Sequence, residues 1–590
     1  MSTAIVTGQP VPGSSLESDL RALGFEVRPA ADASDAAALL ATVPGDRRVA
    51  VVDARFVGHP HALRLGLTDP RFPLAAIPGA VTAQPAARQA LTRALAREAA
   101  TGGGTVLAVD GLVTALDADV HRPELGSLVA AVPADPQTRN EARQAVAAVD
   151  DEAVRLKSAV KSRDGFFTTF FISPYSRYIA RWCARRGLTP NQVTTASLLT
   201  ALIAASCAAT GTRAGFVAAG VLLIASFVLD CTDGQLARYS LQYSTLGAWL
   251  DATFDRAKEY AYYAGLALGA ARGGDDVWAL ALGAMILQTC RHVVDFSFNE
   301  ANHDATANTS PTAALSDRLD SVGWTVWVRR MIVLPIGERW ALIAVLTAAT
   351  TPRITFYVLL AGCALAASYT TAGRVLRSLT RKARRTDRAA RALADLADCG
   401  PVAALVARVL PRRSLLPAFV WALAGTALLL LTAWFDGPGL PVVLAAGVYA
   451  LISGEAVRRP LKGALDWLVP PLFRAAEYGT VLVLAAKSGV NGVLPAAFGL
   501  VAAVAYHHYD TVYRIRGGAG APPAWLVRAI GGQEGRTLLV AVLAAALTAA
   551  QFEVALTVLA VAVAGLVLVE SIRFWVSAGA PAVHDEGEPA

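Results

Sequence analysis

From residue 193 onward the chain is a succession of apolar runs, and this feature restricts its fold more than any other. Six runs lie at 193–211, 214–232, 246–271, 277–298, 338–350 and 354–373, and six more at 415–435, 438–454, 467–486, 490–506, 536–551 and 553–576. Many approach the ~20 residues with which a helix crosses a bilayer. In lipid, backbone N–H and C=O groups must form their hydrogen bonds within the protein, as they do in a helix. The runs therefore predict a mainly α-helical polytopic membrane protein.

Composition and charge support this interpretation. Of the 590 residues, 54% are hydrophobic and only 17% are charged, whereas soluble domains are about 25% charged. The net charge is +7, yet residues 1–150 hold 13 basic and 16 acidic residues, so the positive charge lies in the apolar part. A basic apolar region suits anionic lipids or phosphate ligands better than nucleic acid. No nucleic-acid partner is therefore expected.

Residues 1–145 predict a soluble α/β domain ahead of the membrane. Short apolar runs at 4–7, 49–52, 105–109 and 128–132 alternate with helical stretches at 15–23 and 86–98. Such alternation is typical of a parallel sheet with helices on its faces. The first 15 residues lack the basic and apolar regions of a signal peptide, so we expect this domain in the cytoplasm.

Charge in the connecting segments predicts the topology. A connector and a juxtamembrane amphipathic helix are expected at 146–192, and six spans at 193–378. Residues 374–413 contain eleven Lys and Arg, so the positive-inside rule makes 379–414 a basic cytoplasmic linker. Six spans return the chain to its starting side. A second helical module at 415–578, of open role, and a polar tail at 579–590 complete the chain.

Four aspartates indicate where chemistry is expected. Asp230 and Asp233 are three residues apart and Asp251 and Asp255 four apart, so each pair shares one helical face. All four lie at or inside the ends of apolar runs, where a charge costs several kcal/mol unless it is paired or wet. Carboxylate oxygens favour Mg²⁺, Mn²⁺ or Ca²⁺ over zinc. Two such cations can bridge a diphosphate and stabilise both the attacking and the leaving oxygen.

Small residues and an arginine accompany these carboxylates. Gly234, Ala237 and Gly247 leave room for a ligand against the helix backbone. Arg238 supplies a guanidinium that can bind a phosphate or pair with a carboxylate. Together the residues predict a pyrophosphate site with two metal ions at the membrane surface.

The complete pattern, D-x2-D-G-x2-A-R-x8-G-x3-D-x3-D, resembles the signature of the CDP-alcohol phosphotransferase (CDP-alcohol phosphatidyltransferase) family at every fixed position. Residues 166–186, 188–194 and 337–339 are also similar to family segments, so the resemblance covers roughly 157–378. It implies six transmembrane helices around a polar cavity open to the cytoplasm, a homodimer in the cell (plasma) membrane, and two Mg²⁺ or Mn²⁺ ions.

The resemblance also implies roles for individual residues. The metal ligands would be Asp230, Asp233, Asp251 and Asp255. The cytidine diphosphate pocket would be shaped by Asn191, Gly234, Ala237, Arg238 and Gly247. Asp255 would also be the general base: it would deprotonate an acceptor hydroxyl, which attacks the β-phosphorus of a CDP-alcohol and expels CMP. The expected function is therefore phospholipid biosynthesis.

The substrates are harder to predict. Residues 157–167 resemble more narrowly the transferase half of bifunctional inositol-phosphate cytidylyltransferase/di-inositol-phosphate-phosphate synthases. The loop at 7–15, however, has two prolines and no Lys or Arg, which makes it a poor triphosphate cradle. We therefore interpret the first domain as a degenerate nucleotidyltransferase-like domain, regulatory or structural, in which Asp53 and Asp110 are ordinary turn or capping residues or vestigial metal ligands.

If the first domain makes no CDP-inositol, the expected donor is CDP-diacylglycerol. The acceptor would then be a polar alcohol such as inositol phosphate or glycerol phosphate. Candidates to hold an acceptor phosphate are Arg256, Lys258, Arg291, Lys161 and Arg177. Pairing with Asp295, Glu259 or lipid headgroups is the alternative for the buried ones. Two other functions stay open: a di-inositol phosphodiester synthase that uses CDP-inositol, and a non-catalytic membrane scaffold or transporter.

The second module contains one polar cluster. Residues 506–510 read Tyr-His-His-Tyr-Asp, Arg474 and Glu477 lie in another apolar run, and residues 531–536 read Gly-Gly-Gln-Glu-Gly-Arg. Three interpretations stay open: interfacial anchoring and ion pairing, metal or proton-relay chemistry in which His507 pairs with Asp510, and a lipid or substrate conduit.

Overall fold

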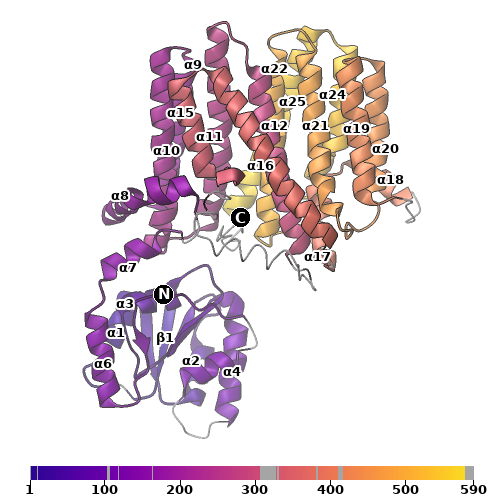
Figure 1. Ribbon diagram of the computed structural model, residues 1–590. Helices are drawn as coiled ribbons and strands as arrows, with labels where there is room; N and C mark the ends of the chain where they lie inside the picture. The colour runs from indigo at the N-terminus through magenta and orange to yellow at the C-terminus, as the bar shows by residue number, and fades with distance from the viewer. Residues whose placement is uncertain are drawn as a thin grey trace. The chain divides into compact units, whose positions relative to one another are not determined.

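The computed structural model describes residues 2–577 apart from 10, 102–106, 117–118, 162–163, 304, 306–326, 328–330, 381–382 and 410–415. The chain divides into two compact units (Figure 1). The first contains Met1–Lys161, Arg177–Thr189 and Gly234–Tyr243, and the second contains Ser162–Ser176, Pro190–Asp233 and Ser244–Ala590. The expected tail, 579–590, lies outside the described residues.

The first unit is built on a five-stranded sheet with the order β2-β1-β3-β6-β5. Its strands are β1 (Ser2–Thr7), β2 (Phe25–Ala30), β3 (Val49–Asp53), β5 (Leu74–Ile77) and β6 (Ala80–Ala83). β1 pairs in parallel with β2 and β3, whereas β6 is antiparallel to both β3 and β5. A pair of two-residue strands, β4 (Val57–Gly58) and β7 (Ala130–Ala131), lies outside this sheet.

Helices cover both faces of the sheet. Ile5 of β1 belongs to the core under α2 (Ala33–Thr42) and α4 (Arg88–Thr101). Its neighbours Ala4 and Val6 point the other way, toward α1 (Leu16–Ala22) and α3 (Pro60–Thr68). Because side chains alternate across a strand, one apolar run fills two cores. The other helices among the described residues of 1–161 are the 3-10 helix η1 (Pro85–Ala87), α5 (Val109–Thr114), α6 (Pro136–Ala147) and α7 (Asp151–Ser158).

The α/β class is confirmed, but two of the predicted strands do not lie in the sheet where the sequence predicted them. Of 105–109, only 107–109 are described, and Val109 begins α5 rather than lying in a strand. Within 128–132 only β7 forms, and it pairs with β4 instead of the sheet. Beside β3, the sheet continues with the β5–β6 hairpin, which turns at Gly79 with φ +75°. Because β6 is antiparallel to β3, the sheet is mixed and not parallel as predicted.

The two carboxylates considered as vestigial metal ligands have local partners. Asp53 binds the guanidinium of Arg55 at 2.8 Å and accepts its amide at 2.8 Å. Asp110 accepts the amide of Gly79 at 2.9 Å. These contacts agree with the turn and capping interpretation of both residues.

A helix stands at each of the twelve apolar runs. They are α9 (Pro190–Ala209), α10 (Arg213–Ser240), α11 (Thr245–Arg272), α12 (Trp278–Asn302), α15 (Ile336–Ala349), α16 (Pro352–Thr380), α19 (Ala418–Asp436), α20 (Leu440–Val457), α21 (Val469–Ala486), α22 (Val493–Arg516), α24 (Gly532–Ala546) and α25 (Ala549–Ser577). By length and apolar composition, seven described helices could cross a membrane, those at 190–209, 213–240, 352–380, 418–436, 440–457, 466–486 and 549–577. The protein is therefore a multi-pass helical membrane protein with an N-terminal α/β domain.

The segment expected as a basic linker is part of the second module. α17 (Asp387–Leu396) and α18 (Pro401–Val409) form within 379–414, and α17 packs against α12, α21 and α22. Leu393 and Leu396 are buried there. The basic composition concealed an amphipathic helix whose apolar face belongs to the core.

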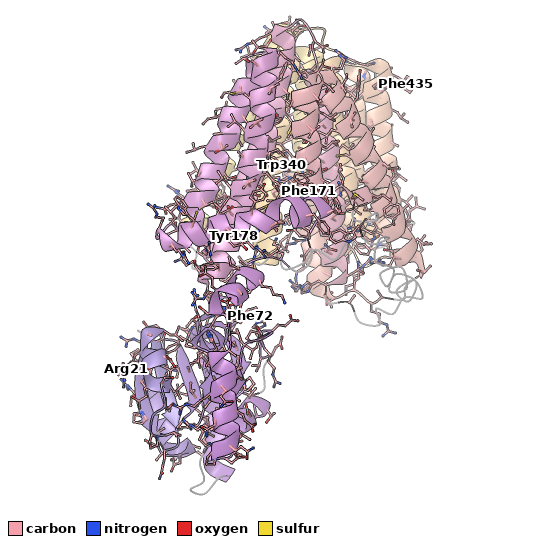
Figure 2. The ribbon with its side chains drawn as sticks, turned by 60° about the vertical axis from the view of Figure 1, so that its left-hand side comes forward. Arg21, Phe72, Phe171, Tyr178, Trp340 and Phe435 are labelled. Carbon is pink, nitrogen blue, oxygen red and sulfur yellow. The ribbon has the colours of Figure 1, made fainter. Side chains whose placement is uncertain are left out.

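The expected juxtamembrane helix consists of a π-helical turn at Thr168–Ile172 followed by α8 (Ser173–Arg185). Several of its aromatic side chains are exposed, among them Phe171 at 56% and Tyr178 at 43%, both labelled in Figure 2. Exposed aromatic side chains on a helix with basic residues are typical of the membrane interface.

Candidate active site

The four signature aspartates lie on two helices. α10 carries Asp230 and Asp233, and α11 carries Asp251 and Asp255. Ser244 caps α11, because its Oγ accepts the amide of Gly247 at 2.9 Å. This cap starts the helix at Thr245, so that Asp251 and Asp255 follow one turn apart on one face.

Three of the carboxylates come together. One oxygen each of Asp230, Asp233 and Asp251 lies within 4.8 Å of the other two. Asp233 is buried, Asp230 is half-buried and Asp251 is exposed. Oδ2 of Asp233 is buried without a hydrogen-bond partner among the described residues. A buried carboxylate oxygen without a donor calls for a cation, and an all-oxygen set suits a hard divalent ion.

Lys258 ties the fourth aspartate to this cluster. Its ammonium contacts Asp230 on α10 and lies 2.9 Å from Oδ1 of Asp255 on its own helix. The side chain is 1% exposed and also donates to Ser197 of α9 at 3.3 Å. Lys258 thus fixes carboxylates from two helices around one buried charge.

Gly247 allows a close approach between α11 and α9. A Cβ atom on Gly247 would lie 2.6 Å from Oδ1 of Asn191 and 2.8 Å from Oγ of Ser244. Both distances are shorter than side chains tolerate, so Asn191 can hold its position only beside a glycine. The structure therefore brings two of the predicted nucleotide-pocket residues into contact.

The other predicted pocket residues follow Asp233 on α10. Gly234, Ala237 and Arg238 are half-buried in its last two turns. Within the first unit, Nε of Arg238 donates to the carbonyl of Ala159 at 2.6 Å. A Cβ on Gly234 would meet only the Arg238 guanidinium, at 3.5 Å or more. Packing therefore does not demand a glycine at 234.

Comparison with known proteins assigns this part of the chain. Residues 187–367 match the CDP-alcohol phosphatidyltransferase family. The chain carries a CDP-alcohol phosphatidyltransferase domain. Residues 387–590 match a family of unknown function, DUF5941, whose limits place α17 and α18 with the second module.

Three relatives each resemble a stretch of this chain. A phosphatidylinositol phosphate synthase of Mycolicibacterium smegmatis is 36% identical over 122 residues, 20% of this chain and 53% of that protein. An archaetidylinositol phosphate synthase of Pyrococcus horikoshii is 31% identical over 113 residues, 19% and 58% of the two chains. A bifunctional IPC transferase and DIPP synthase of Aquifex aeolicus is 32% identical over 114 residues, 19% and 26% of the two chains. The matched stretch thus spans between about a quarter and three fifths of these relatives.

The buried candidates for an acceptor phosphate have partners inside the transferase domain. Arg256 pairs with Glu259 at 2.8 Å, which is one of the alternatives that the sequence left open. Lys258 pairs with Asp230 and Asp255. Arg291 donates to the carbonyl of Val333, and Asp295, its other expected partner, contacts Arg374.

The two candidates outside the spans lie in the first unit. Lys161 is exposed, and Arg177 stacks over the ring of Tyr178 at 5.2 Å. None of the five is seen to form a shared phosphate site, so their role stays a prediction.

The sequence named Glu259 only as an alternative partner for the buried basic residues, whereas the structure places it at the centre of several contacts. Its carboxylate is buried, pairs with Arg256 and with Arg339 of α15 at 3.3 Å, and accepts the hydroxyl of Tyr263 at 2.8 Å. The available signal was its spacing of three residues from Arg256 inside an apolar run. Arg256 also lies over the ring of Tyr509, 5.4 Å from its centroid, so α22 of the second module borders the transferase domain.

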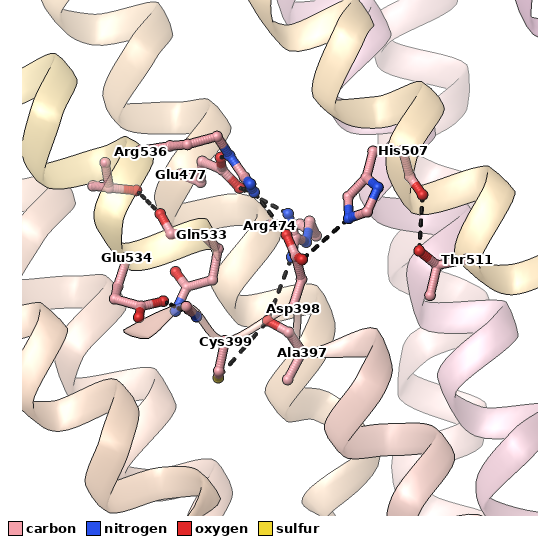
Figure 3. A network of polar contacts seen from close by, with 12 residues as sticks. Ala397, Asp398, Cys399, Arg474, Glu477, His507, Thr511, Gln533, Glu534 and Arg536 are labelled. Atoms are coloured by element: carbon pink, nitrogen blue, oxygen red, sulfur yellow. Dashed lines mark hydrogen bonds and ion pairs between the residues drawn. The ribbon is translucent and has the colours of Figure 1, made fainter. Parts of the chain in front are cut away.

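The polar cluster of the second module is a buried ion-pair network (Figure 3). Asp398, which follows α17, binds Arg536 at 2.7 Å, Arg474 at 3.1 Å and His507 at 3.2 Å. Glu477 binds the same two arginines at 2.6 and 2.8 Å. His507 therefore does not pair with Asp510, which instead binds Arg514 at 2.9 Å. The contacts agree with the ion-pairing interpretation.

Proposed function

We propose that the transferase domain moves a phosphatidyl group from CDP-diacylglycerol to a hydroxyl of inositol phosphate and releases CMP. The observation that carries this proposal is the cluster of Asp230, Asp233 and Asp251, with its buried unpartnered oxygen, inside the family match. The family uses a CDP-alcohol donor and an alcohol acceptor. Inositol phosphate is the favoured acceptor because two of the relatives are named as synthases of an inositol phosphate lipid.

The family depends on divalent metal ions, and the residues present fit them. Asp230, Asp233 and Asp251 would be the ligands, with Asp255 beside them. Mg²⁺ or Mn²⁺ ions, two in our proposal, would neutralise the charge that develops on the diphosphate during displacement. Glycerol phosphate is the second acceptor to be tested.

The chain's own residues would then orient and deprotonate the acceptor. Asp255, held by Lys258, would take the proton of the acceptor hydroxyl. The freed oxygen forms a bond to the β-phosphorus, and the bond from that phosphorus to the bridging oxygen of CMP breaks. Asn191 and Gly247, with Gly234, Ala237 and Arg238 on α10, would hold the cytidine diphosphate.

One observation favours a second donor. The Aquifex relative is named as a bifunctional IPC transferase and DIPP synthase, and residues 1–161 of this chain form an α/β domain that precedes the transferase domain in sequence. CDP-inositol is therefore the alternative donor, and its product would be a water-soluble phosphodiester.

The decisive experiment measures CMP release by the purified full-length protein in detergent with Mg²⁺. CDP-diacylglycerol and CDP-inositol are each offered with labelled inositol phosphate, glycerol phosphate, inositol or serine. We expect CMP only with CDP-diacylglycerol and inositol phosphate, and the label in the lipid extract. Asp251→Asn and Asp255→Asn should each lower turnover by about 10² to 10⁴-fold, and EDTA should abolish it.

Asp275→Asn provides the matched control. Asp275 is a carboxylate of the same domain, 40% exposed and paired with Arg353 on the surface, so its loss should leave turnover unchanged. No CMP from any pair in folded protein would contradict a transferase, and CMP release with CDP-inositol that leaves no label in the lipid extract would select the alternative. We further propose a homodimer in the plasma membrane with the site facing the cytoplasm, which light scattering and protease accessibility in sealed vesicles would test.

A further inference from the structure

The first unit contains a cavity of about 230 Å³. Its walls include Ser14, Ser15 and Asp19, from the segment after β1, and Phe56–Gly58, from the segment after β3. In the sheet order β2-β1-β3-β6, the chain leaves β1 toward one edge and β3 toward the other. Ligands of open α/β sheets bind where such connections diverge, beyond the carboxyl ends of the strands.

Two arginines of α6 complete the cavity. Arg143 donates to the carbonyl of Gly13 and so joins α6 to the segment after β1. Nη2 of Arg139 is buried and has no acceptor among the described residues. A buried guanidinium donor without an acceptor is unfavourable, and the planar guanidinium matches a phosphate group. The geometry thus leaves this donor available to an acceptor from outside the chain, and the positive charge of the guanidinium favours an anion.

We propose that this cavity binds the phosphate monoester of a small polyol. Arg139 and Arg143 would bind the phosphate, while Ser14, Ser15 and the carboxylate of Asp19 would accept or donate hydrogen bonds to hydroxyls. The volume lies below the roughly 300–1,000 Å³ of pockets for drug-sized ligands, which favours such a ligand over a nucleoside triphosphate. Asp53 and Asp110 are not among the residues that line the cavity, and they contact Arg55 and Gly79, so the proposal is for binding alone.

The test measures binding to the full-length protein in detergent by isothermal titration calorimetry. The probes are inositol 1-phosphate, glycerol 3-phosphate, CMP, CTP and inorganic phosphate. All titrations use an Asp251→Asn background with EDTA, so that the transferase site contributes no metal-dependent binding and the result does not depend on turnover. We expect binding of the two polyol phosphates, weakened at least tenfold by Arg139→Gln and by Arg143→Gln.

Three further arms make the result specific. Arg93→Gln, an exposed arginine of α4, should bind as the parent does. Asp19→Asn should weaken the polyol phosphates but not inorganic phosphate. Hydrogen exchange should show protection at 13–20 and 136–147 on binding, with unchanged exchange in β1 reporting that each variant is folded. No binding at millimolar probe, binding unaffected by Arg139→Gln in folded protein, or CMP or CTP bound tenfold more tightly than the polyol phosphates would overturn the proposal.

Discussion

Adding one methyl group at Gly247 should lower activity without unfolding the protein. Alanine favours helices over glycine by up to ~1 kcal/mol, yet a Cβ here would lie 2.6 Å from Oδ1 of Asn191. Because Asn191 must then move, we expect Gly247→Ala to lower CMP release at least tenfold while the protein stays folded. Turnover and the thermal midpoint in detergent measure the two effects.

Gly283 supplies the control for this substitution. A Cβ on Gly283 of α12 would meet only Leu360, at an ordinary 3.9 Å, so Gly283→Ala should keep native turnover. The double variant Gly247→Ala with Asn191→Ala removes the contact with Asn191 and leaves the 2.8 Å contact with Oγ of Ser244. It should not restore turnover, because the amide that we assign to the nucleotide is gone. Native turnover in Gly247→Ala would refute the role of the contact.

His61 makes the stability of the first unit depend on pH. The residue is 2% exposed, and neither ring nitrogen has a described hydrogen-bond partner. Burial, with help from the charge of Arg155, lowers the pKa of His61 from 6.5 to about 4. The unfolded chain therefore gains a proton below pH 6.5 that the folded domain accepts only near pH 4. The free energy of unfolding should therefore decrease by up to about 3 kcal/mol as the pH falls from 6.5 to about 4, and the contribution of His61 should be fully present above pH 6.5.

Urea unfolding of the full-length protein tests this expectation. The midpoint for the β1 peptide, read by hydrogen exchange and corrected for the intrinsic rate at each pH, should fall between pH 7 and pH 4.5. His61→Leu cannot titrate and should flatten that slope. An equally steep slope in His61→Leu would assign the pH dependence to other groups.

At the scale of elements, the apolar runs predicted where the helices lie but not which partners their charged residues contact. All twelve runs contain helices, and Asp230 and Asp233 of α10 lie together with Asp251 of α11. The linker was misread because local composition reports charge, whereas burial of α17 depends on distant helices. Asp398 binds Arg474 and Arg536, 76 and 138 residues further along the chain. No local period encodes such contacts.

The network around Asp398 should hold α17, α21, α22 and α24 together. Asp398→Asn would leave two buried guanidinium groups with Glu477 as their remaining carboxylate partner in the network. Breaking a buried ion pair by removing one partner costs about 3–5 kcal/mol. We expect a matching fall in the unfolding free energy of the full-length protein in detergent, partly reversed when Arg536→Gln is added.

Asp387, the first residue of α17, is the matched control for Asp398, which follows that helix. Its side chain is 76% exposed and pairs with Lys462 on the surface, so Asp387→Asn should change stability by no more than about 1 kcal/mol. If Asp398→Asn destabilises the protein no more than Asp387→Asn does, the network contributes little to the fold.

At the scale of the whole molecule, segments that match two different families share one packed unit. α12 of the transferase domain packs against α21 and α22 of the second module. The hydroxyl of Tyr509 on α22 lies 2.6 Å from Nδ1 of His292 on α12, and its ring lies under Arg256 of α11. The sequence predicts 415–578 as a separate module, because apolar helices carry little information about which neighbours they contact. The packing makes the second module part of the wall behind the proposed site.

Tyr509 lets this dependence be measured. Arg256 directly follows the proposed general base, Asp255, and a desolvated cation–π contact is worth about 2 kcal/mol, or roughly 30-fold. We expect Tyr509→Leu to lower kcat/KM for the acceptor by about that factor, through displacement of Arg256, while metal dependence is retained. Tyr509→Phe keeps the aromatic face and loses only the hydroxyl, so it should retain most of the activity. Equal losses in the two variants would assign the effect to the hydrogen bond with His292, and native kinetics in both would show that the transferase domain functions independently of α22.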